Sequence, residues 1–302
     1  MAKVSVCCIT YNHEHFLAQA IESVLMQQTD FDVELVIGED CSTDNTRAIV
    51  LDYQQRYPGR IRALLPAANL GIMVNLFNTL NACEGEYIAL LEGDDYWTDP
   101  QKLARQVAVL EAQPECVLCI HDAEVFADDG SIEPHPYSSQ FPALLSAEHP
   151  VITQSDLVLK SWGMPTASML FRRSAMQLPE WYKGVYSGDY TLQLLLTQHG
   201  YIYYLPRVMS RYRHHAASIT QATHRNKSVG IFDKKIFEQL QYQKLLPRYA
   251  VTYEPYLQQL YFERSLLKRE QKHYAAGWLD YARAVLLSPD TFKRWLFRFS
   301  PK

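Results

Sequence analysis

The sequence predicts an α/β fold with a mainly parallel sheet and flanking helices, followed by a C-terminal region built from helices alone. Over residues 1–120, short apolar runs alternate with segments whose apolar residues recur at helical spacing. From about 122 the pattern changes to short strand-like pieces and loops, and after about 226 only helical patterns follow. Strands separated by single helices pair in parallel through right-handed crossovers, which is why we expect a mainly parallel sheet.

The first 120 residues predict strands and helices in regular alternation. Runs rich in β-branched residues, leucine and cysteine indicate buried strands at 3–9, 33–38, 61–65, 86–91 and 117–121. Apolar residues spaced three and four apart indicate helices between these strands, at 15–26, 46–57, 72–82 and 101–113. Pro58 and Gly59 end the second of these helices.

The rest of the chain predicts a second half of the same domain and then a helical region. Strand-like pieces at 168–171 and 201–204 flank a helix at 189–198. Later helices are expected at 256–269, 273–287 and 291–299. We therefore predict one domain over 1–225, with halves at 1–120 and 121–225, and a helical region at 226–302.

Composition excludes several classes of protein. With 302 residues, 48% of them hydrophobic, the chain can bury a sizeable core and is not disordered. No apolar run approaches the ~18 residues of a spanning helix, and the N-terminus becomes polar too soon for a secretory signal peptide. Cys116-x-x-Cys119 has no second pair at zinc spacing, so we expect it to pack in the core. These observations predict a cytoplasmic protein with reduced cysteines.

The net charge of −4 conceals an asymmetry along the chain. Residues 1–130 hold 7 Lys and Arg against 21 Asp and Glu, a net −14, whereas residues 131–302 carry a net +10. An acidic half does not suit nucleic acid, which requires a basic face, so we expect no nucleic-acid partner. The basic half could contact phosphate groups or a membrane surface.

Polar side chains follow each predicted strand, at the sheet edge where open parallel sheets bind their ligands. Thr10, Tyr11 and Asn12 follow the first strand, and carboxylates cluster after the second and fourth. Neither a Gly-x-Gly-x-x-Gly nor a Walker-type loop is present to hold phosphates. Adjacent carboxylates would repel a bare diphosphate unless a divalent cation such as Mg²⁺ lies between them.

Three blocks in order, ITYNHEHFLAQAIESVLMQQ, VIGEDCSTDNT and GEYIALLEGDDYWTDPQKL, resemble glycosyltransferase family 2, which has the GT-A fold. The resemblance covers residues 3–110, and beyond about 125 only SGDYTLQLLL and SRYRHHAAS fit. It implies a nucleotide-base pocket lined by Thr10, Tyr11 and Asn12. In members that use UDP, the carboxylate at the position of Asp40 accepts the uracil N3–H.

The resemblance also implies a metal and a catalytic base. The segment from Glu92 to Asp95 (EGDD) occupies the Asp-x-Asp position of the family. Within it Glu92 would contact the nucleotide sugar, Asp94 would face the ribose and diphosphate, and Asp95 would bind Mn²⁺ or Mg²⁺. Asp189 matches the catalytic base, and His215 matches a histidine that joins the metal in some members. Two departures are the glutamates at 39 and 92, where many members carry aspartate, and the glycine at 188, where an acidic residue usually precedes the base.

Each assignment has a simpler alternative. Asp40 could be a turn residue, Asp189 could cap the helix that it precedes, and His215 could be a surface histidine, since His13 and His214 are equally available. We expect Asp44 to cap the helix that follows it. The tail at 291–299 mixes aromatic and basic residues, so either membrane-surface contact or packing would suit it.

The predicted function is inverting, metal-dependent transfer of a sugar from a nucleoside-diphosphate sugar to a hydroxyl of a saccharide or lipid-linked saccharide. UDP is the expected nucleotide, and synthesis of a surface polysaccharide is the expected setting. A cytoplasmic enzyme at the inner face of a membrane fits this setting. The alternatives are a non-catalytic binding module with the same fold and, less well supported, a sugar nucleotidyltransferase, which would require a Gly-rich basic loop after the first strand.

Overall fold

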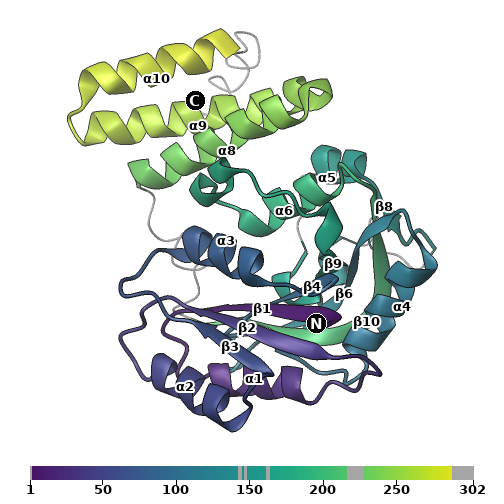
Figure 1. Cartoon of the computed structure of the whole chain (residues 1–302). Helices are drawn as coiled ribbons and strands as arrows, with labels where there is room; N and C mark the ends of the chain where they lie inside the picture. Colours follow the sequence, from purple (N-terminus) through teal and green to yellow (C-terminus); the bar gives the residue numbers. More distant parts are fainter. Residues whose placement is uncertain (1, 142–144, 146–147, 161–163, 216–227, 288–302) are drawn as a thin grey trace. The chain divides into compact units, whose positions relative to one another are not determined.

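The computed structural model describes residues 2–141, 145, 148–160, 164–215 and 228–287 (Figure 1). Within this part of the chain, residues 2–183 and 188–215 form one compact unit, and residues 184–187 and 228–287 form a second. The predicted domain boundary at 225/226 and the predicted helix at 291–299 lie outside the described residues. No described helix combines the length and the apolar character needed to cross a bilayer.

The first unit is built on a mixed sheet with the strand order β3-β2-β1-β4-β9-β6-β10-β5, in which β7 adds to β6 and β8 adds to β10. The pairs β1–β2, β2–β3, β1–β4 and β6–β10 are parallel, and the other pairs are antiparallel. The strands are β1 (Val4–Thr10), β2 (Val33–Glu39), β3 (Ile61–Leu64), β4 (Tyr87–Glu92), β5 (Tyr96–Trp97), β6 (Cys116–Ala127), β7 (His135–Pro136), β8 (Val151–Ile152), β9 (Leu170–Arg172) and β10 (Tyr201–His214).

Helices cover both faces of the parallel part of this sheet, which explains why all seven residues of β1 are buried. Figure 1 shows α3 on the opposite face from α1 and α2. Val4 and Val6 of β1 share a core with Ile21 of α1 and Val50 of α2. The α-helices of this unit are α1 (Leu17–Leu25), α2 (Thr46–Arg56), α3 (Ile72–Ala82), α4 (Lys102–Ala112), α5 (Gln154–Lys160) and α6 (Gly188–Leu196).

Two strands extend well beyond the apolar runs that predicted them. The predicted strands at 117–121 and 201–204 are the starts of β6 and β10, which pair in parallel as far as His214 and Ala127. The sequence pattern breaks because the later parts of both strands bury polar residues. Asp122, for example, is 5% exposed and accepts hydrogen bonds from Ser138. The predicted division of the domain at 120/121 falls inside β6.

The second unit contains α8 (Val229–Leu245), α9 (Ala250–Glu270) and α10 (Tyr274–Leu287), which confirms the predicted helices at 256–269 and 273–287. Phe232, Ile236, Leu257 and Leu260 contribute to its apolar core. A buried ion cluster links α9 to α10. In this cluster Arg264 donates to both carboxylate oxygens of Asp280, at 2.8 and 2.7 Å, and Lys268 donates to one of them at 2.9 Å.

All six cysteines are free thiols, and five of them are buried. Cys116 and Cys119 are both 0% exposed in β6, where burial raises the pKa of Cys116 to about 11. A protonated thiol in an apolar strand packs like a small hydrophobic side chain and does not bind metal. The prediction that this Cys-x-x-Cys packs in the core is therefore confirmed.

Candidate active site

The carboxyl ends of β1, β2 and β4 lie side by side, which brings the polar residues after them to one edge of the sheet. In the strand registers Thr10 pairs with Glu39, and Ile9 pairs with Glu92. Just beyond the strands, the backbone N–H of Asp40 donates to the carbonyl oxygen of Thr10 at 3.0 Å. The loops that follow the three strands therefore form one continuous surface, as expected for ligand binding at this edge.

Asp94 lies between two histidines at this edge. Its Oδ2 is 3.0 Å from Nε2 of His215 and 3.8 Å from Nε2 of His13. Burial opposes ionisation of Asp94, but the hydrogen bond with His215 and the two nearby imidazoles lower the pKa of this carboxyl. These three side chains form the one group of three or more potential ligands in the described part of the chain that could share a cation, with ligand atoms within 4.8 Å of one another.

His13 is held in place by the loops after β1 and β2. Its backbone N–H donates to Oγ1 of Thr46 at 2.8 Å, and its Nδ1 lies 3.3 Å from Oγ1 of Thr10. Burial lowers the pKa of His13, which favours the neutral imidazole that binds metals. His13 was not chosen from the sequence, although its place directly after the first strand was a usable signal.

Asp95, the residue predicted to bind the metal, is bonded to β10 through one of its two carboxylate oxygens. It is 2% exposed, its Oδ1 accepts the backbone N–H of Arg213 at 2.8 Å, and its Oδ2 has no partner among the described residues. Burial raises the pKa of Asp95 well above its usual range. The sequence assigned the metal to Asp95, whereas the geometry places its neighbour Asp94 beside His215. The difference arises because β10 provides a backbone donor for Asp95.

Arg213 organises this carboxylate turn and was missed in the sequence. It is 5% exposed, its Nε donates to the carbonyl oxygen of Asp94 at 2.8 Å, and its terminal nitrogens contact Gln19 and Asp128. The guanidinium also lies 4.7 Å from the ring centre of Phe16. An arginine between aromatic residues in a strand was the available signal for a stacked, buried role.

The arginines of β10 form ion pairs with carboxylates of the first unit. Arg207 pairs with Asp99 at 3.0 Å, and Arg211 pairs with Glu124. These carboxylates therefore partner two of the charges of the basic half.

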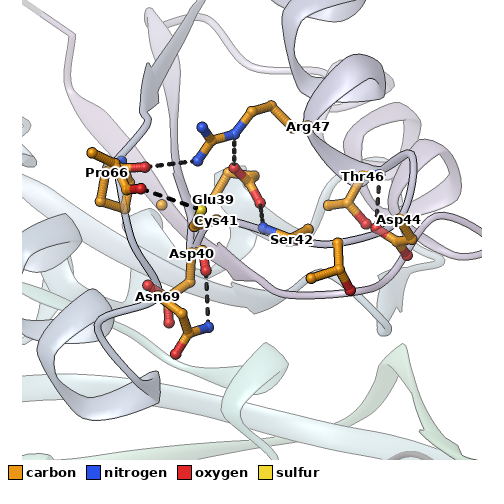
Figure 2. Close-up of polar contacts among 12 residues, drawn as sticks. Glu39, Asp40, Cys41, Ser42, Asp44, Thr46, Arg47, Pro66 and Asn69 are labelled. Atoms are coloured by element: carbon orange, nitrogen blue, oxygen red, sulfur yellow. Dashed lines mark hydrogen bonds and ion pairs between the residues drawn. The ribbon is translucent and has the colours of Figure 1, made fainter.

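Asp40 forms hydrogen bonds with the loop that precedes α3, and Figure 2 shows its contact with Asn69. It is 2% exposed, its Oδ1 accepts the N–H of Leu70 at 2.8 Å, and its Oδ2 accepts the N–H of Gly71 at 2.9 Å. Figure 2 shows the amide of Asn69 pointing at the carbonyl oxygen of Asp40, 2.9 Å away. The turn role that competed with nucleotide binding is thus present. Each carboxylate oxygen has two lone pairs, so acceptor capacity for a ligand remains.

The loop after β2 is fixed by further side chains. Glu39 is 0% exposed, accepts the N–H of Ser42 at 2.6 Å and pairs with Arg47 (Figure 2). Asp44 accepts the N–H of Thr46, the first residue of α2, at 2.9 Å. The N-cap residue of α2 is Asn45, so Asp44 satisfies the first N–H of the helix from one residue before the cap.

The three residues predicted to line the base pocket differ in their exposure and in their hydrogen bonds. Thr10 is 3% exposed, whereas Tyr11 is 41% exposed and presents an aromatic ring at the sheet edge. Asn12 has a left-handed backbone with φ of 54°, and its Oδ1 accepts the N–H of Thr43 at 2.8 Å. Asn12 therefore joins the first and second loops, and Tyr11 is the residue with the surface to contact a base.

Asp189 lies in the first turn of α6, partly exposed. Burial raises the pKa of Asp189, while the backbone N–H groups of Tyr190 and Asp189 hold it down in part. Because α6 begins at Gly188, Asp189 lies inside the helix and not at its N-cap. Burial, together with the charges of Asp94 and Asp189, raises the pKa of Glu92 to about 8. The charge of Asp189 therefore acts on Glu92, the last residue of β4.

The glycine before Asp189 packs against α3. A Cβ at Gly188 would lie 2.7 Å from Cε of Met73, the flexible end of that side chain, so a larger residue here would require Met73 to move. The carbonyl oxygen of Gly188 accepts the hydroxyl of Tyr182 at 2.9 Å.

Comparison with known proteins identifies the same family as the sequence motifs. The family model of Glycosyl transferase family 2 matches residues 5–177. Uncharacterized protein Rv1520 of Mycobacterium tuberculosis is 35% identical over 226 residues, which span 74% of this chain and 62% of that protein. This chain therefore spans less than two thirds of the length of that relative.

Two solved structures share the fold. Staphylococcus aureus TarS 1–349 in complex with UDP-GlcNAc matches with a TM-score of 0.64 at 17% identity, covering 94% of this chain and 81% of the other. The mannosyltransferase PcManGT of Pyrobaculum calidifontis, in complex with GDP-Man and Mn²⁺, matches with a TM-score of 0.58 at 15% identity, covering 94% and 75%. Both are glycosyltransferases of the GT-A type, which confirms the predicted fold class.

Proposed function

The chain belongs to glycosyltransferase family 2, and from this premise we propose that it transfers a sugar, with inversion, from a UDP-sugar to a hydroxyl of a saccharide or lipid-linked saccharide acceptor. The observation that carries the proposal is the grouping of Asp94, His13 and His215 at the carboxyl edge of the sheet, together with a second carboxylate, Asp189, whose charge acts on Glu92 there. A cation site for a diphosphate and a separate carboxylate base are the two parts that a single displacement requires.

The donor site that we propose lies over the loops after β1 and β2. The exposed ring of Tyr11 would stack on the base, and the remaining lone pairs of Asp40 would accept the uracil N3–H. The TarS complex with UDP-GlcNAc supports UDP, whereas the PcManGT complex holds GDP-Man. The choice between nucleotides is therefore part of the test.

The residues present fit a divalent metal. We assign Asp94, His13 and His215 as its ligands, which moves the metal from Asp95 to its neighbour. One carboxylate with two imidazoles suits Mn²⁺ better than Mg²⁺, which prefers oxygen ligands. When bound, such a cation neutralises the diphosphate and stabilises the charge that develops on it as it leaves.

Asp189 is the proposed base. It takes the proton of the acceptor hydroxyl while that oxygen forms a bond to the anomeric carbon. The bond from the anomeric carbon to the diphosphate breaks on the opposite face, which inverts the configuration. Burial raises the pKa of Asp189 and so makes it a stronger base than an exposed aspartate.

Two measurements on the full chain test the proposal. Calorimetric titration of UDP, GDP and dTDP, with Mn²⁺ and with EDTA, should show Mn²⁺-dependent binding of UDP. Asp94→Asn should weaken this binding by about tenfold or more. Asp52→Asn changes an exposed aspartate of α2 and serves as the matched control. Folded protein that binds none of the nucleotides would favour the non-catalytic module.

The second measurement addresses the base. Asp189→Asn should keep UDP binding and lower the rate of UDP release from the preferred UDP-sugar by about 10²–10⁴-fold. Water can serve as the acceptor, so the assay does not depend on knowing the natural one. An unchanged rate in Asp189→Asn would remove this residue from the mechanism and leave the nucleotide site standing.

A further inference from the structure

A short segment in the middle of the chain belongs to the second unit. Residues 184–187 cluster with the helices after 228, although the residues on either side of them belong to the first unit. This segment ends directly before Gly188, where α6 begins and brings Asp189 into its first turn. Contacts that hold residues 184–187 in place therefore restrict the backbone that leads into Asp189.

The contacts on this segment come from α8. Oε2 of Glu238 accepts the backbone N–H of Tyr186 at 2.8 Å and that of Ser187 at 2.6 Å. Two successive N–H groups on one carboxylate oxygen form an anion-binding concavity, and such charge-assisted bonds are roughly twice as strong as neutral ones. Glu238 is 4% exposed, so water competes little for these bonds.

Neighbouring residues of α8 contact the same segment. Nζ of Lys235 lies 4.5 Å from the ring centre of Tyr186. A Cβ at Gly184 would lie 3.1 Å from Cε1 of Phe237, so helix and segment are in close contact. The attachment therefore involves three residues of α8, and Glu238 provides its hydrogen bonds.

We propose that Glu238 is a positioning residue for Asp189, so that α8 takes part in the reaction by fixing the chain before the base. The inference rests on the proposed role of Asp189. Tyr182 holds the carbonyl oxygen of Gly188 from the first unit, and Glu238 holds the two N–H groups before it. Together they restrict the backbone on which the base is carried. A base displaced by ~1 Å loses up to about 10²-fold in rate, so this restraint has a measurable consequence.

The test compares Glu238→Ala and Glu238→Gln in the full chain, with Lys234→Ala on an exposed position of the same helix as the control. Hydrogen exchange of the peptide 184–191 reports the backbone directly. UDP release from UDP-glucose and UDP-N-acetylglucosamine, with water as acceptor, reports the rate. Glu238→Ala should speed exchange and lower kcat by about tenfold or more, with the donor KM changed less than about twofold.

Glu238→Gln should recover kcat to within about threefold, because its amide oxygen accepts the same two N–H groups. In the Asp189→Asn background, Glu238→Ala should have no further effect, since it acts through that residue. An unchanged kcat in folded Glu238→Ala, or an equal loss in both backgrounds, would overturn the inference. If Glu238→Ala does not fold, Glu238→Asp replaces it, and the shorter side chain should lose kcat where glutamine keeps it.

The two proposals fail in different ways. Full activity of Asp189→Asn would refute the base assignment on which this inference rests. Loss of activity in Asp189→Asn with an unaffected Glu238→Ala would refute the role of Glu238 alone.

Discussion

Lys102 of α4 is buried without a carboxylate partner, and its replacement by methionine should stabilise the protein at neutral pH. The side chain is 0% exposed, and Nζ donates to Oε1 of Gln106 at 2.8 Å. Nζ also lies 4.0 Å from the ring centre of Trp97. An ammonium group has three donors, and no ion pair to Lys102 occurs in the described residues. Burial lowers the pKa of Lys102 from 10.5 to about 7.

The magnitude follows from linkage. The folded pKa lies below the unfolded one, so the penalty is fully present below pH ~7 and fades as the pH rises toward 10.5. The shift corresponds to about 4 kcal/mol at pH 7, about 2 at pH 9 and about 1 at pH 10. Methionine removes this penalty but leaves Gln106 without its donor, which costs about 2 kcal/mol. It also loses the contact of the ammonium with Trp97, about 1 kcal/mol.

Lys102→Met should therefore be more stable than the parent by about 1 kcal/mol at pH 7, a rise of about 2–4 °C in Tm. The order should reverse by pH 10, where the parent lysine is neutral in the fold. Calorimetric scans at pH 7, 9 and 10 measure both effects, with Lys234→Met as the exposed control. A difference between variant and parent that does not change with pH would refute the reasoning, because it would mean that the buried amine carries no proton-linked penalty.

Three further predictions follow from single contacts. Gly38→Ala should lower the free energy of unfolding by about 1–3 kcal/mol in thermal unfolding, because the new Cβ would lie 2.0 Å from a threonine hydroxyl of α3. The control is Gly230→Ala, whose Cβ would have free space and should leave the stability unchanged. Asp280→Asn should cost the helical unit about 1.5–3 kcal/mol, because it removes the charged partner of two hydrogen bonds from the buried Arg264 and leaves Asp233 as its ion-pair partner; unchanged denaturant unfolding would contradict this. Because burial raises the pKa of Asp189, kcat/KM should fall on the acid side with a midpoint above 3.8, and a profile flat down to that pH would exclude it as the base.

The fold was largely accessible from the sequence because its signals are local. The alternation of buried strands and amphipathic helices over residues 1–120 needs only hydrophobic periodicity, and the structure has those elements in that order. The strands β6 and β10 were predicted too short because a polar side chain ends an apolar pattern whether or not it is hydrogen-bonded in the fold. Asp122 illustrates this, since its buried carboxylate is satisfied by Ser138.

The location of the site was also accessible, but its internal assignments were not. Carboxylates that follow buried strands meet at one edge of the sheet, and the structure has Asp40, Asp94 and Asp95 after neighbouring strands. The use of each oxygen depends on donors from elsewhere in the chain. The two carboxylate oxygens of Asp40 accept backbone N–H groups of the loop before α3, and one oxygen of Asp95 accepts a backbone N–H of β10.

The sequence by itself indicated the family and the main strands and helices of residues 1–120, and it predicted the sheet edge at which we propose the chemistry, because each depends on local spacing. Only the tertiary structure decided which of two adjacent aspartates meets His215, since that depends on a strand more than a hundred residues away. It alone also placed residues 184–187 against Glu238, because contacts between segments distant in the sequence form only when the chain has folded.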